Sequence, residues 1–515
     1  MIKLLKHLKN PSLYPIITAL GLGTIIILFI PTLFHKYSIE IVDHQNIYNN
    51  QVYYSDLNSD GNSERISLKT VNKQYSYVNF YNKQNALSHV WNIRGAIQEN
   101  IDIVIDDFDN NSYKEIYLFS TINDSLFINY YEYNESGTGN RVSHFITKIS
   151  RRYNSPDFGV STAKKLYDIN EDNFKELFFS VYGKFSLHPR KLYSYDIKNN
   201  TIQTSKDNGI ILEGLKTLKT PNGLIITGNS HATNYYIKNN KTEYKGDKGW
   251  LMVFNKELKF QFPPISFNSK DANIQTEFIH LDNTDLIIAH ISYDFGLKDQ
   301  KIITYNLKGR VIWERINHDK NIKWKKLLNT TSNINTDMFL IRKDNIIERL
   351  SPDLLTLKTY EVNNTKKSSF YSINFTNKNQ NEIIQWNPAS HTLTIHNNNF
   401  SNNISISLPK LLNNKITISK INNSKNNLCT IKDFNHWYLI KYSFNSFYPF
   451  KYFVYGLIYF LIFLILYLIQ KIYIIRDLKK EQIIARLRVS SLKNQMDPHF
   501  TLNALNAVGS SILKD

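Results

Sequence analysis

The sequence predicts a membrane protein with a large all-β domain outside the membrane. Two apolar segments, residues 13–34 and 452–475, are long enough to cross a bilayer as helices, because a hydrocarbon core of about 30 Å needs about 20 helical residues. The stretch 36–446 between them alternates short apolar runs with Asn, Gly and Lys turn signals, a pattern typical of successive β-strands. A dense polar motif around His499 follows the second segment.

The basic residues that flank the two apolar segments predict the orientation of the chain. They precede the first segment and follow the second, at Lys3, Lys6, Lys9, Lys471, Arg476, Lys479, Lys480, Arg486 and Arg488. Positive residues mark the cytoplasmic side. We therefore expect a two-pass protein of the cell inner (plasma) membrane, with residues 1–12 and the C-terminus cytoplasmic and 36–446 extracytoplasmic. No small-x-small cleavage site follows residue 34, so the first segment is expected to stay as an anchor.

Charge and cysteine content exclude two further interpretations. The formal net charge of +18 would suit a protein that binds nucleic acid. However, the lysines form no cluster except beside the two apolar segments, so no nucleic-acid partner is expected. Cys429 is the only cysteine, which excludes an intrachain disulfide in the outer domain.

The outer domain contains an internal repeat with oxygen-bearing side chains at positions 1, 3 and 5 and Glu at position 9. The three copies are Asp56, Asn58, Asp60 and Glu64; Asp107, Asp109, Asn111 and Glu115; and Asp168, Asn170, Asp172 and Glu176. Each copy is followed by an apolar strand, at 66–68, 116–119 and 177–181, and later copies at 224–226, 286–289, 338–341 and 382–384 keep the strand without the acids. The pattern resembles the FG-GAP/VCBS repeats of integrin-like propellers.

Hairpin signals between these strands predict a β-propeller. Seven segments with a central turn lie near residues 78, 126, 192, 251, 302, 346 and 393. Their spacing of about 45 to 66 residues is that of a four-stranded blade. We predict seven blades. The alternative is an eighth blade, in which a copy at 422–444 closes the ring with the N-terminal strand 38–42.

The acidic loops are candidate calcium sites. Hard oxygen ligands at alternating positions, closed by a Glu, suit Ca²⁺. Gly61 occupies the sixth position of the first loop only, where it permits a sharp turn, so this loop is the strongest candidate. The alternative is that Asp and Asn side chains only form side-chain-to-backbone turns. The extracytoplasmic ligand of the domain is not identified by any motif.

The motif around His499 indicates the function. Gln495, Pro498-His499-Phe500, Asn503 and Asn506 are spaced as in L-x-x-Q-x-x-P-H-F-L-F-N-x-L-N. This resembles the phosphoacceptor box of LytS-type sensor histidine kinases, with departures at Thr501 and Leu502. The resemblance implies that His499 carries a phosphoryl group and that Asn503 orients a water or an acceptor carboxylate. Pro498 is expected to kink the helix.

The family resemblance also implies ATP as cosubstrate, a homodimer and a LytTR-type response regulator as partner. Residues 476–496 are expected to form a coiled-coil linker that leads into the phosphoacceptor region. Residues 490–515 are expected to be the first, incomplete part of that region. No Gly-rich phosphate motif occurs, so the chain alone is expected to lack an ATP site and kinase activity. The alternative function is a membrane-anchored propeller for adhesion or scaffolding without kinase activity.

Overall fold

The structure is a computed structural model that divides the chain into two compact units. It describes residues 14–513 apart from 30–34, 47–49, 83, 98–102, 135, 149–157, 164, 184–188, 233–243, 245, 268–270, 282–283, 294–298, 320, 331–336, 376–380, 398, 401–402, 414–415, 422–426, 434 and 496–497. The larger unit is Tyr37–Ser443, and the smaller unit joins Met1–Lys36 to Phe444–Asp515.

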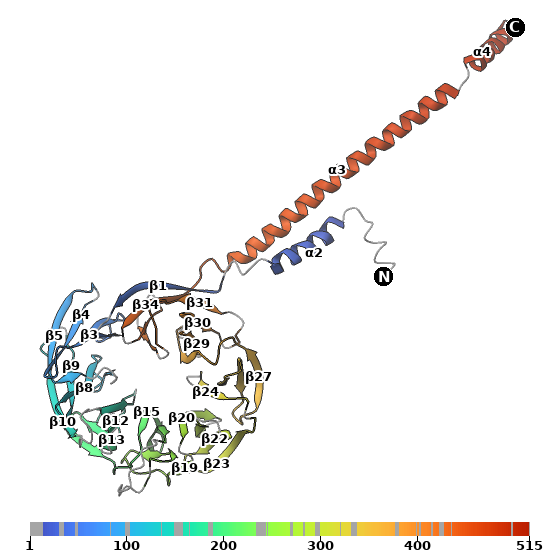
Figure 1. The fold of residues 1–515 in the computed structure, drawn as a ribbon. Helices are drawn as coiled ribbons and strands as arrows, with labels where there is room; N and C mark the ends of the chain where they lie inside the picture. Colours follow the sequence, from blue (N-terminus) through green and yellow to red (C-terminus); the bar gives the residue numbers. More distant parts are fainter. Residues whose placement is uncertain are drawn as a thin grey trace. The chain divides into compact units, whose positions relative to one another are not determined.

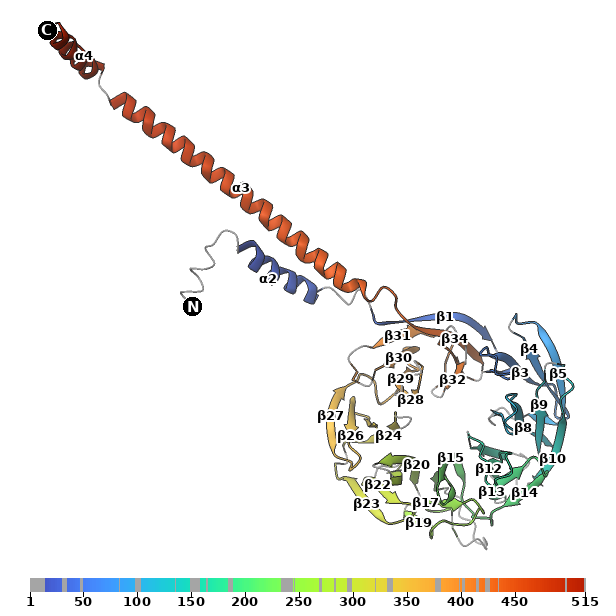
Figure 2. The same ribbon diagram turned by 180° about the vertical axis from the view of Figure 1, so that it is seen from behind.

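The larger unit is a ring of antiparallel β-meanders (Figures 1 and 2). Blade 1 contains β2 (Asn50–Ser55), β3 (Glu64–Thr70), β4 (Tyr75–Tyr81) and β5 (Leu87–Arg94). Blade 2 contains β6 (Ala96–Ile97), β7 (Val104–Asp106), β8 (Glu115–Ile122), β9 (Ser125–Glu132) and β10 (Arg141–Lys148). Blade 3 contains β11 (Phe158–Thr162), β12 (Leu177–Gly183), β13 (Arg190–Asp196) and β14 (Thr201–Thr204). Blade 4 contains β15 (Leu212–Thr220), β16 (Gly223–His231), β17 (Gly249–Leu251), β18 (Val253–Asn255) and β19 (Ile265–Phe267).

The second half of the ring repeats this arrangement. Blade 5 contains β20 (Ala272–Leu281), β21 (Thr284–Tyr293), β22 (Gln300–Asn306) and β23 (Val311–Asn317). Blade 6 contains β24 (Trp324–Asn329), β25 (Met338–Arg342), β26 (Ile346–Leu350) and β27 (Thr356–Glu361). Blade 7 contains β28 (Ser369–Ile373), β29 (Glu382–Asn387), β30 (Thr392–His396) and β31 (Ile404–Ser407). Blade 8 contains β32 (Thr417–Ile421), β33 (Leu428–Lys432), β34 (His436–Phe444) and, from the other end of the domain, β1 (Tyr37–Asn46).

The described strands therefore form eight blades, and the expectation of seven is wrong. The seven turn-containing segments are the third strands of blades 1 to 7. The eighth blade lacks a complete copy in the sequence because its fourth strand comes from the N-terminus. The alternative closure, with β1 beside β34, is the one observed (Figure 1).

The hydrophobic core is divided among the contacts between successive blades. In the second strand of a blade, side chains alternate between the two neighbouring blades, and both sets are buried. In β8, Tyr117 and Phe119 pack toward blade 3, whereas Ile116 and Leu118 pack toward blade 1. This burial on both faces explains why these strands read as continuous apolar runs. Eight such clusters occur among the described residues, and Val52 with Trp437 forms the one that joins blade 8 to blade 1.

Pairing of β1 with β34 closes the ring. Tyr37 stacks on Tyr442 with ring centroids 5.0 Å apart, and the Ser38 and Ser443 hydroxyls lie 3.1 Å apart. At the other end of the pair, the His44 and His436 rings are 5.6 Å apart. The strands are thus antiparallel, and the start of β1 lies beside the end of β34.

The propeller has two faces that differ in their loops. Loops between the first and second strands of a blade lie on one face, together with both ends of the propeller chain. We call this the acidic-loop face, because the three acidic repeats form such loops. The opposite face carries the second-to-third-strand loops and the connections to the next blade, and we call it the connection face.

In the described residues, the smaller unit contains three helices. They are α2 (Tyr14–Phe29), α3 (Phe450–Gln495) and α4 (Pro498–Ile512). Among the described residues, one helix, Phe450–Lys493, is long and apolar enough to cross a membrane, and α2 has only 16 residues. The predicted first span extends beyond α2 at both ends into residues outside the described part. Residues 1–12 also lie outside that part. Two membrane crossings therefore stay a prediction. The predicted segment 452–475 and the linker 476–496 are continuous in α3 as far as Gln495.

Small residues let α2 approach α3 closely. A Cβ atom added at Gly23 would lie 2.4 Å from the ring of Tyr459, and Thr24 Oγ1 lies 3.1 Å from the Tyr459 hydroxyl. Ala19, one turn earlier, is also buried. Close backbone approach at small residues is a recurrent way for apolar helices to pair.

Gly23→Leu is expected to separate α2 from α3, because no side chain fits between Gly23 and Tyr459. Gly21→Leu is the matched control, since a Cβ there meets nothing within 4 Å. Spin labels on Ile17→Cys and Leu457→Cys would measure the separation, with an expected increase of about 2 Å or more for Gly23→Leu alone. The native Cys429 is buried and would stay unlabelled. Equal distances in both variants would contradict the observed packing.

Candidate metal-binding loops and the His499 helix

The three acidic loops share one conformation. Each final Glu accepts a backbone N–H from the residue seven positions earlier, in the pairs Leu57–Glu64 (2.8 Å), Phe108–Glu115 (2.8 Å) and Ile169–Glu176 (2.9 Å). Each first Asp accepts the N–H of position six, in the pairs Asp56–Gly61 (3.0 Å), Asp107–Ser112 (3.0 Å) and Asp168–Asn173 (2.9 Å). The repeat therefore specifies a hydrogen-bonded turn that leads into the second strand of the blade.

Glycine at the sixth position is not required for this turn. Ser112 and Asn173 adopt φ values of 75° and 69°, close to the 83° of Gly61. A non-glycine residue in this left-handed region costs about 1 kcal/mol, which the side-chain-to-backbone bonds of the loop offset. Gly61 therefore does not distinguish the first loop from the others in conformation.

Hydrogen bonds join the loops of neighbouring blades into one row. Ser59 Oγ donates to the Ser112 carbonyl at 2.6 Å, and Asn110 Nδ2 donates to the equivalent Asn173 carbonyl at 3.1 Å. Backbone hydrogen bonds link the same pairs of loops. The Lys114 N–H donates to the Leu57 carbonyl and the Lys175 N–H donates to the Phe108 carbonyl, each at 2.8 Å. A change in one loop can thus reach the next blade directly.

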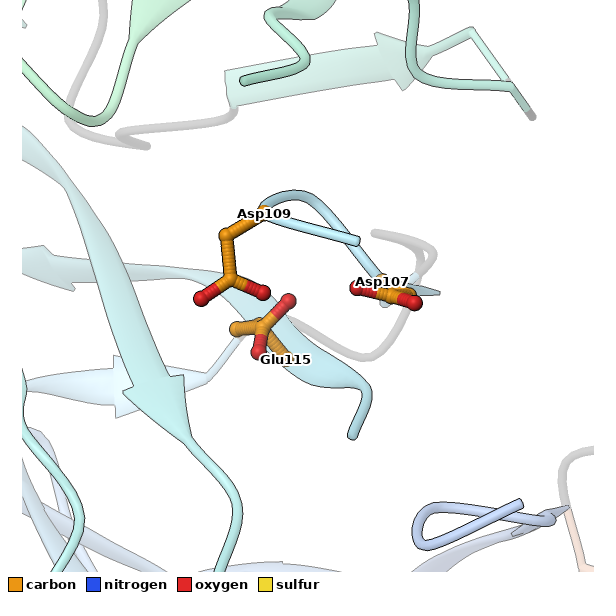
Figure 3. A group of neighbouring side chains, drawn as sticks. All are labelled: Asp107, Asp109 and Glu115. Atoms are coloured by element: carbon orange, nitrogen blue, oxygen red, sulfur yellow. The ribbon is translucent and has the colours of Figure 1, made fainter. Parts of the chain in front are cut away.

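Carboxylates converge in the second and third loops. Ligand oxygens of Asp107, Asp109 and Glu115 lie within 4.8 Å of one another, as do those of Asp168, Asp172 and Glu176. Figure 3 shows Asp107 and Asp109 on their loop with the carboxylate of Glu115 turned toward them from the strand. The carboxylates of the first loop form no such group among the described residues. The geometry therefore favours the second and third loops for a cation.

The turn alone does not explain the environment of the Glu115 carboxylate. Its side chain is fully buried, and its Oε1 atom has no hydrogen-bond partner. Burial, with Asp109 and Asp107 nearby, raises the pKa of Glu115 to about 8. Burial and neighbouring acids raise the pKa of Glu176 to about 7 in the same way. A buried oxygen without a partner, aimed at two further carboxylates, is a fit for a hard cation.

Two contacts were not found from the sequence, one beside the second loop and one in blade 7. Lys175 Nζ donates to the Asp107 carbonyl at 2.5 Å and pairs with Asp106 Oδ1 at 3.4 Å, so the chain supplies some positive charge beside the second loop. Glu382 accepts the Phe375 N–H at 2.9 Å, which is the same closing bond in blade 7. The seven-residue spacing of an apolar residue and Glu identifies this fourth copy, although its other positions lack acids.

His499 lies on the exposed helix α4. Among the described residues α3 ends at Gln495 and α4 begins at Pro498, with residues 496–497 outside the described part, so the kink at Pro498 stays a prediction. Proline lacks the N–H that the helix interior needs but fits the first helical position, where that N–H has no partner. His499 and Asn503 follow on one exposed face, one turn apart.

The comparisons assign the chain to no family. No family model and no curated protein matches the chain. Among solved structures, the chain is similar to BBS1N in complex with ARL6DN, with 9% identity, a TM-score of 0.40 and coverage of 78% of this chain and 96% of that chain. It is also similar to the WD40 domain of SCAP from fission yeast, with 10% identity, a TM-score of 0.41 and coverage of 80% and 99%. The topology of the described strands themselves defines the fold class as a β-propeller-like all-β domain.

Proposed function

We propose that the chain is a membrane-bound sensor histidine kinase of a two-component phosphorelay. In this proposal the propeller senses an extracytoplasmic ligand, His499 carries the phosphoryl group, and an Asp of a LytTR-type response regulator receives it. The observation that carries the proposal is the motif from Gln495 to Asn506, whose His499 is exposed on a helix that begins at the proline. An imidazole in this setting is accessible to an incoming γ-phosphate, for which positioning matters more than covalent activation.

The arrangement of the chain supports a route for the signal. In sequence, β1 follows the first apolar segment and β34 precedes α3, and these two strands pair with each other. A ligand that changes blade 8 would therefore act on the strands next to both predicted membrane segments. Helix α3 is exposed along its cytoplasmic part, where Leu478, Ile484, Leu487 and Leu492 are all about half exposed or more. A homodimer would cover this surface.

Calcium is proposed as a ligand of the acidic-loop face. Asp107, Asp109 and Glu115 would hold one ion, and Asp168, Asp172 and Glu176 a second. Each carboxylate oxygen can accept a backbone N–H and still offer a lone pair to a cation. Ca²⁺ would supply the charge that these groups lack, and its binding energy would tighten the row of loops.

Phosphorylation of His499 is testable with the full chain in detergent. A LytS-type catalytic domain supplied in trans with labelled ATP should label the chain with acid-labile phosphate, because the chain carries no recognisable ATP site. His499→Gln should abolish the label, a loss of more than about 100-fold if no other group substitutes. Ser511→Ala is the control on the same helix, since its hydroxyl only bonds to the Ala507 carbonyl.

Asn503→Ala separates the proposed roles within the motif. It should keep some phosphorylation but slow dephosphorylation, because the amide orients a water and does not attack phosphorus. Label that persists in His499→Gln would contradict the kinase proposal and favour a membrane-anchored adhesion or scaffolding protein.

A further inference from the structure

A cavity on the connection face of the propeller spans the junction of blades 6, 7 and 8. Its volume is about 510 Å³, within the range of small-molecule sites. Its lining combines the start of β24, the β27–β28 connection, the β29–β30 hairpin and the β31–β32 connection. The lining residues are Lys325, Lys366, Lys367, Ser369, Pro388, Ala389 and Leu412.

The charge on this lining is entirely positive. Three lysines contribute to the wall and no Asp or Glu does. Within the part of the chain that the structure describes, neither Lys366 nor Lys367 makes an ion pair, and both are exposed. Hydrogen bonds hold the carboxylate of Asp433 behind Leu412, where it accepts the backbone N–H groups of Leu412, Asn435 and His436 and is not part of the lining. The lining itself therefore carries positive charge only.

Lys325 is held in place at the inner end of the cavity. Its Nζ donates to the carbonyls of Thr365 at 2.9 Å and Lys366 at 3.0 Å, and also to that of Ser368. Burial, together with Lys343 and Lys326 nearby, lowers the pKa of Lys325 to about 8. The ammonium group of Lys325 is thus fixed where it adds to the positive electrostatic potential of the cavity. The side chains of Lys366 and Lys367 have free donors for a ligand. A concave site lined by one sign of charge concentrates ions of the opposite sign.

We infer that this cavity binds a small multivalent anion, with carboxylate or phosphate groups contacted by Lys366 and Lys367. The inference deepens the proposed sensory function, because it names the chemistry of the sensed molecule. The cavity lies on the face opposite the two ends of the propeller chain, and Ser369 begins the inner strand of blade 7, which packs on blade 8. An anion there would hold the β27–β28 connection, which leads into the strand that packs on the blade containing β34.

Anion binding is tested by calorimetric titration of the full chain in detergent. The probes are inorganic phosphate and, separately, succinate, at constant ionic strength. The protein is first freed of calcium with a chelator and then dialysed free of the chelator, because a polycarboxylate chelator would compete for the same cavity. Saturable binding of either probe is expected, and the tighter of the two identifies phosphate or carboxylate chemistry. Lys366→Gln with Lys367→Gln should weaken it by about tenfold or more, since two charge-assisted contacts are lost.

Two controls make the result decisive. Lys256→Gln with Lys259→Gln removes two exposed lysines from the β18 turn and should leave the affinity unchanged. Leu412→Trp keeps every charge but narrows the cavity, and it should also weaken binding. Absence of saturable binding for both probes, or equal weakening in both double variants, would overturn the inference. The titration does not involve His499, so its failure is separable from failure of the kinase proposal.

Discussion

Replacement of Glu115 by Gln is expected to abolish the stabilisation that Ca²⁺ gives through the second acidic loop, to leave that given through the third, and to remove the pH dependence that Glu115 gives to the calcium-free protein. The folded-state pKa of Glu115, about 8, lies above its ordinary value of 4.5. The folded chain therefore holds a proton that the unfolded chain has released between these pH values. The stability contributed by this group is present below pH 4.5 and is lost as the pH rises through about 8.

The size of this effect is bounded by the pKa difference. At about 1.4 kcal/mol per pKa unit, the loss between the two pKa values is at most about 5 kcal/mol. Ca²⁺ should reverse the trend, because the cation favours the ionised carboxylates, and at 100 times its dissociation constant it adds about 2.7 kcal/mol. Glu115→Gln keeps the acceptor for the Phe108 N–H but cannot ionise. It should therefore be more stable than the native chain in chelator at pH 8 and gain less stability from Ca²⁺, through the third loop alone.

Thermal unfolding in chelator and in millimolar Ca²⁺, from pH 5 to 8.5, measures both effects. Glu361→Gln is the control, because Glu361 is exposed and lies far along the ring on β27. If Ca²⁺ changes the melting of neither protein, the acidic loops serve only as turns. If the native chain shows no decline in stability toward pH 8, the burial of Glu115 in the folded protein is contradicted.

Glu348→Gln is expected to destabilise the propeller by about 3 kcal/mol, since it removes one member of a buried ion network. Glu348 is 4% exposed and contacts Arg342 at 2.8 Å within blade 6 and Arg315 at 2.6 Å from blade 5. Thr356 Oγ1 donates to the same carboxylate at 2.7 Å. Burial opposes ionisation, but the hydrogen bonds from Thr356, Arg342 and Arg315 prevail and lower the pKa of Glu348. Loss of the carboxylate leaves two guanidinium groups without this shared partner between two blades.

Glu314→Gln is the matched control in the neighbouring blade. Glu314 pairs with Lys301 at 2.8 Å, but both side chains are more than a third exposed, so the expected loss is about 0.5 kcal/mol or less. Denaturant unfolding of the full chain in detergent compares the two variants. Equal losses would show that the network does not hold blades 5 and 6 together.

Local patterns were sufficient to predict much of the domain. The repeat that ends at Glu64, Glu115 and Glu176 located three turns and the strand after each, because the hydrogen bonds of such a turn are made within nine residues. The buried second strands were recognisable because both faces of each are covered, so that apolar residues predominate in each run. The order of strands within each blade followed from short turns.

Long-range contacts decided the rest. The number of blades depends on whether β1 pairs with β34, and no local signal links Tyr37 to Tyr442 across four hundred residues. The choice among the acidic loops also depended on tertiary packing, since Gly61 favoured the first loop while burial of Glu115 favours the second. The lysine cavity joins Lys325, Lys366 and Leu412 from three separate segments of the ring, and its purely positive lining exists only in that arrangement. By itself the sequence determined the repeating unit and the His499 motif, because both depend on neighbours along the chain. Only the tertiary structure decided the closure of the ring and the electrostatics of its sites, because burial and charge pairing depend on residues that meet through the fold.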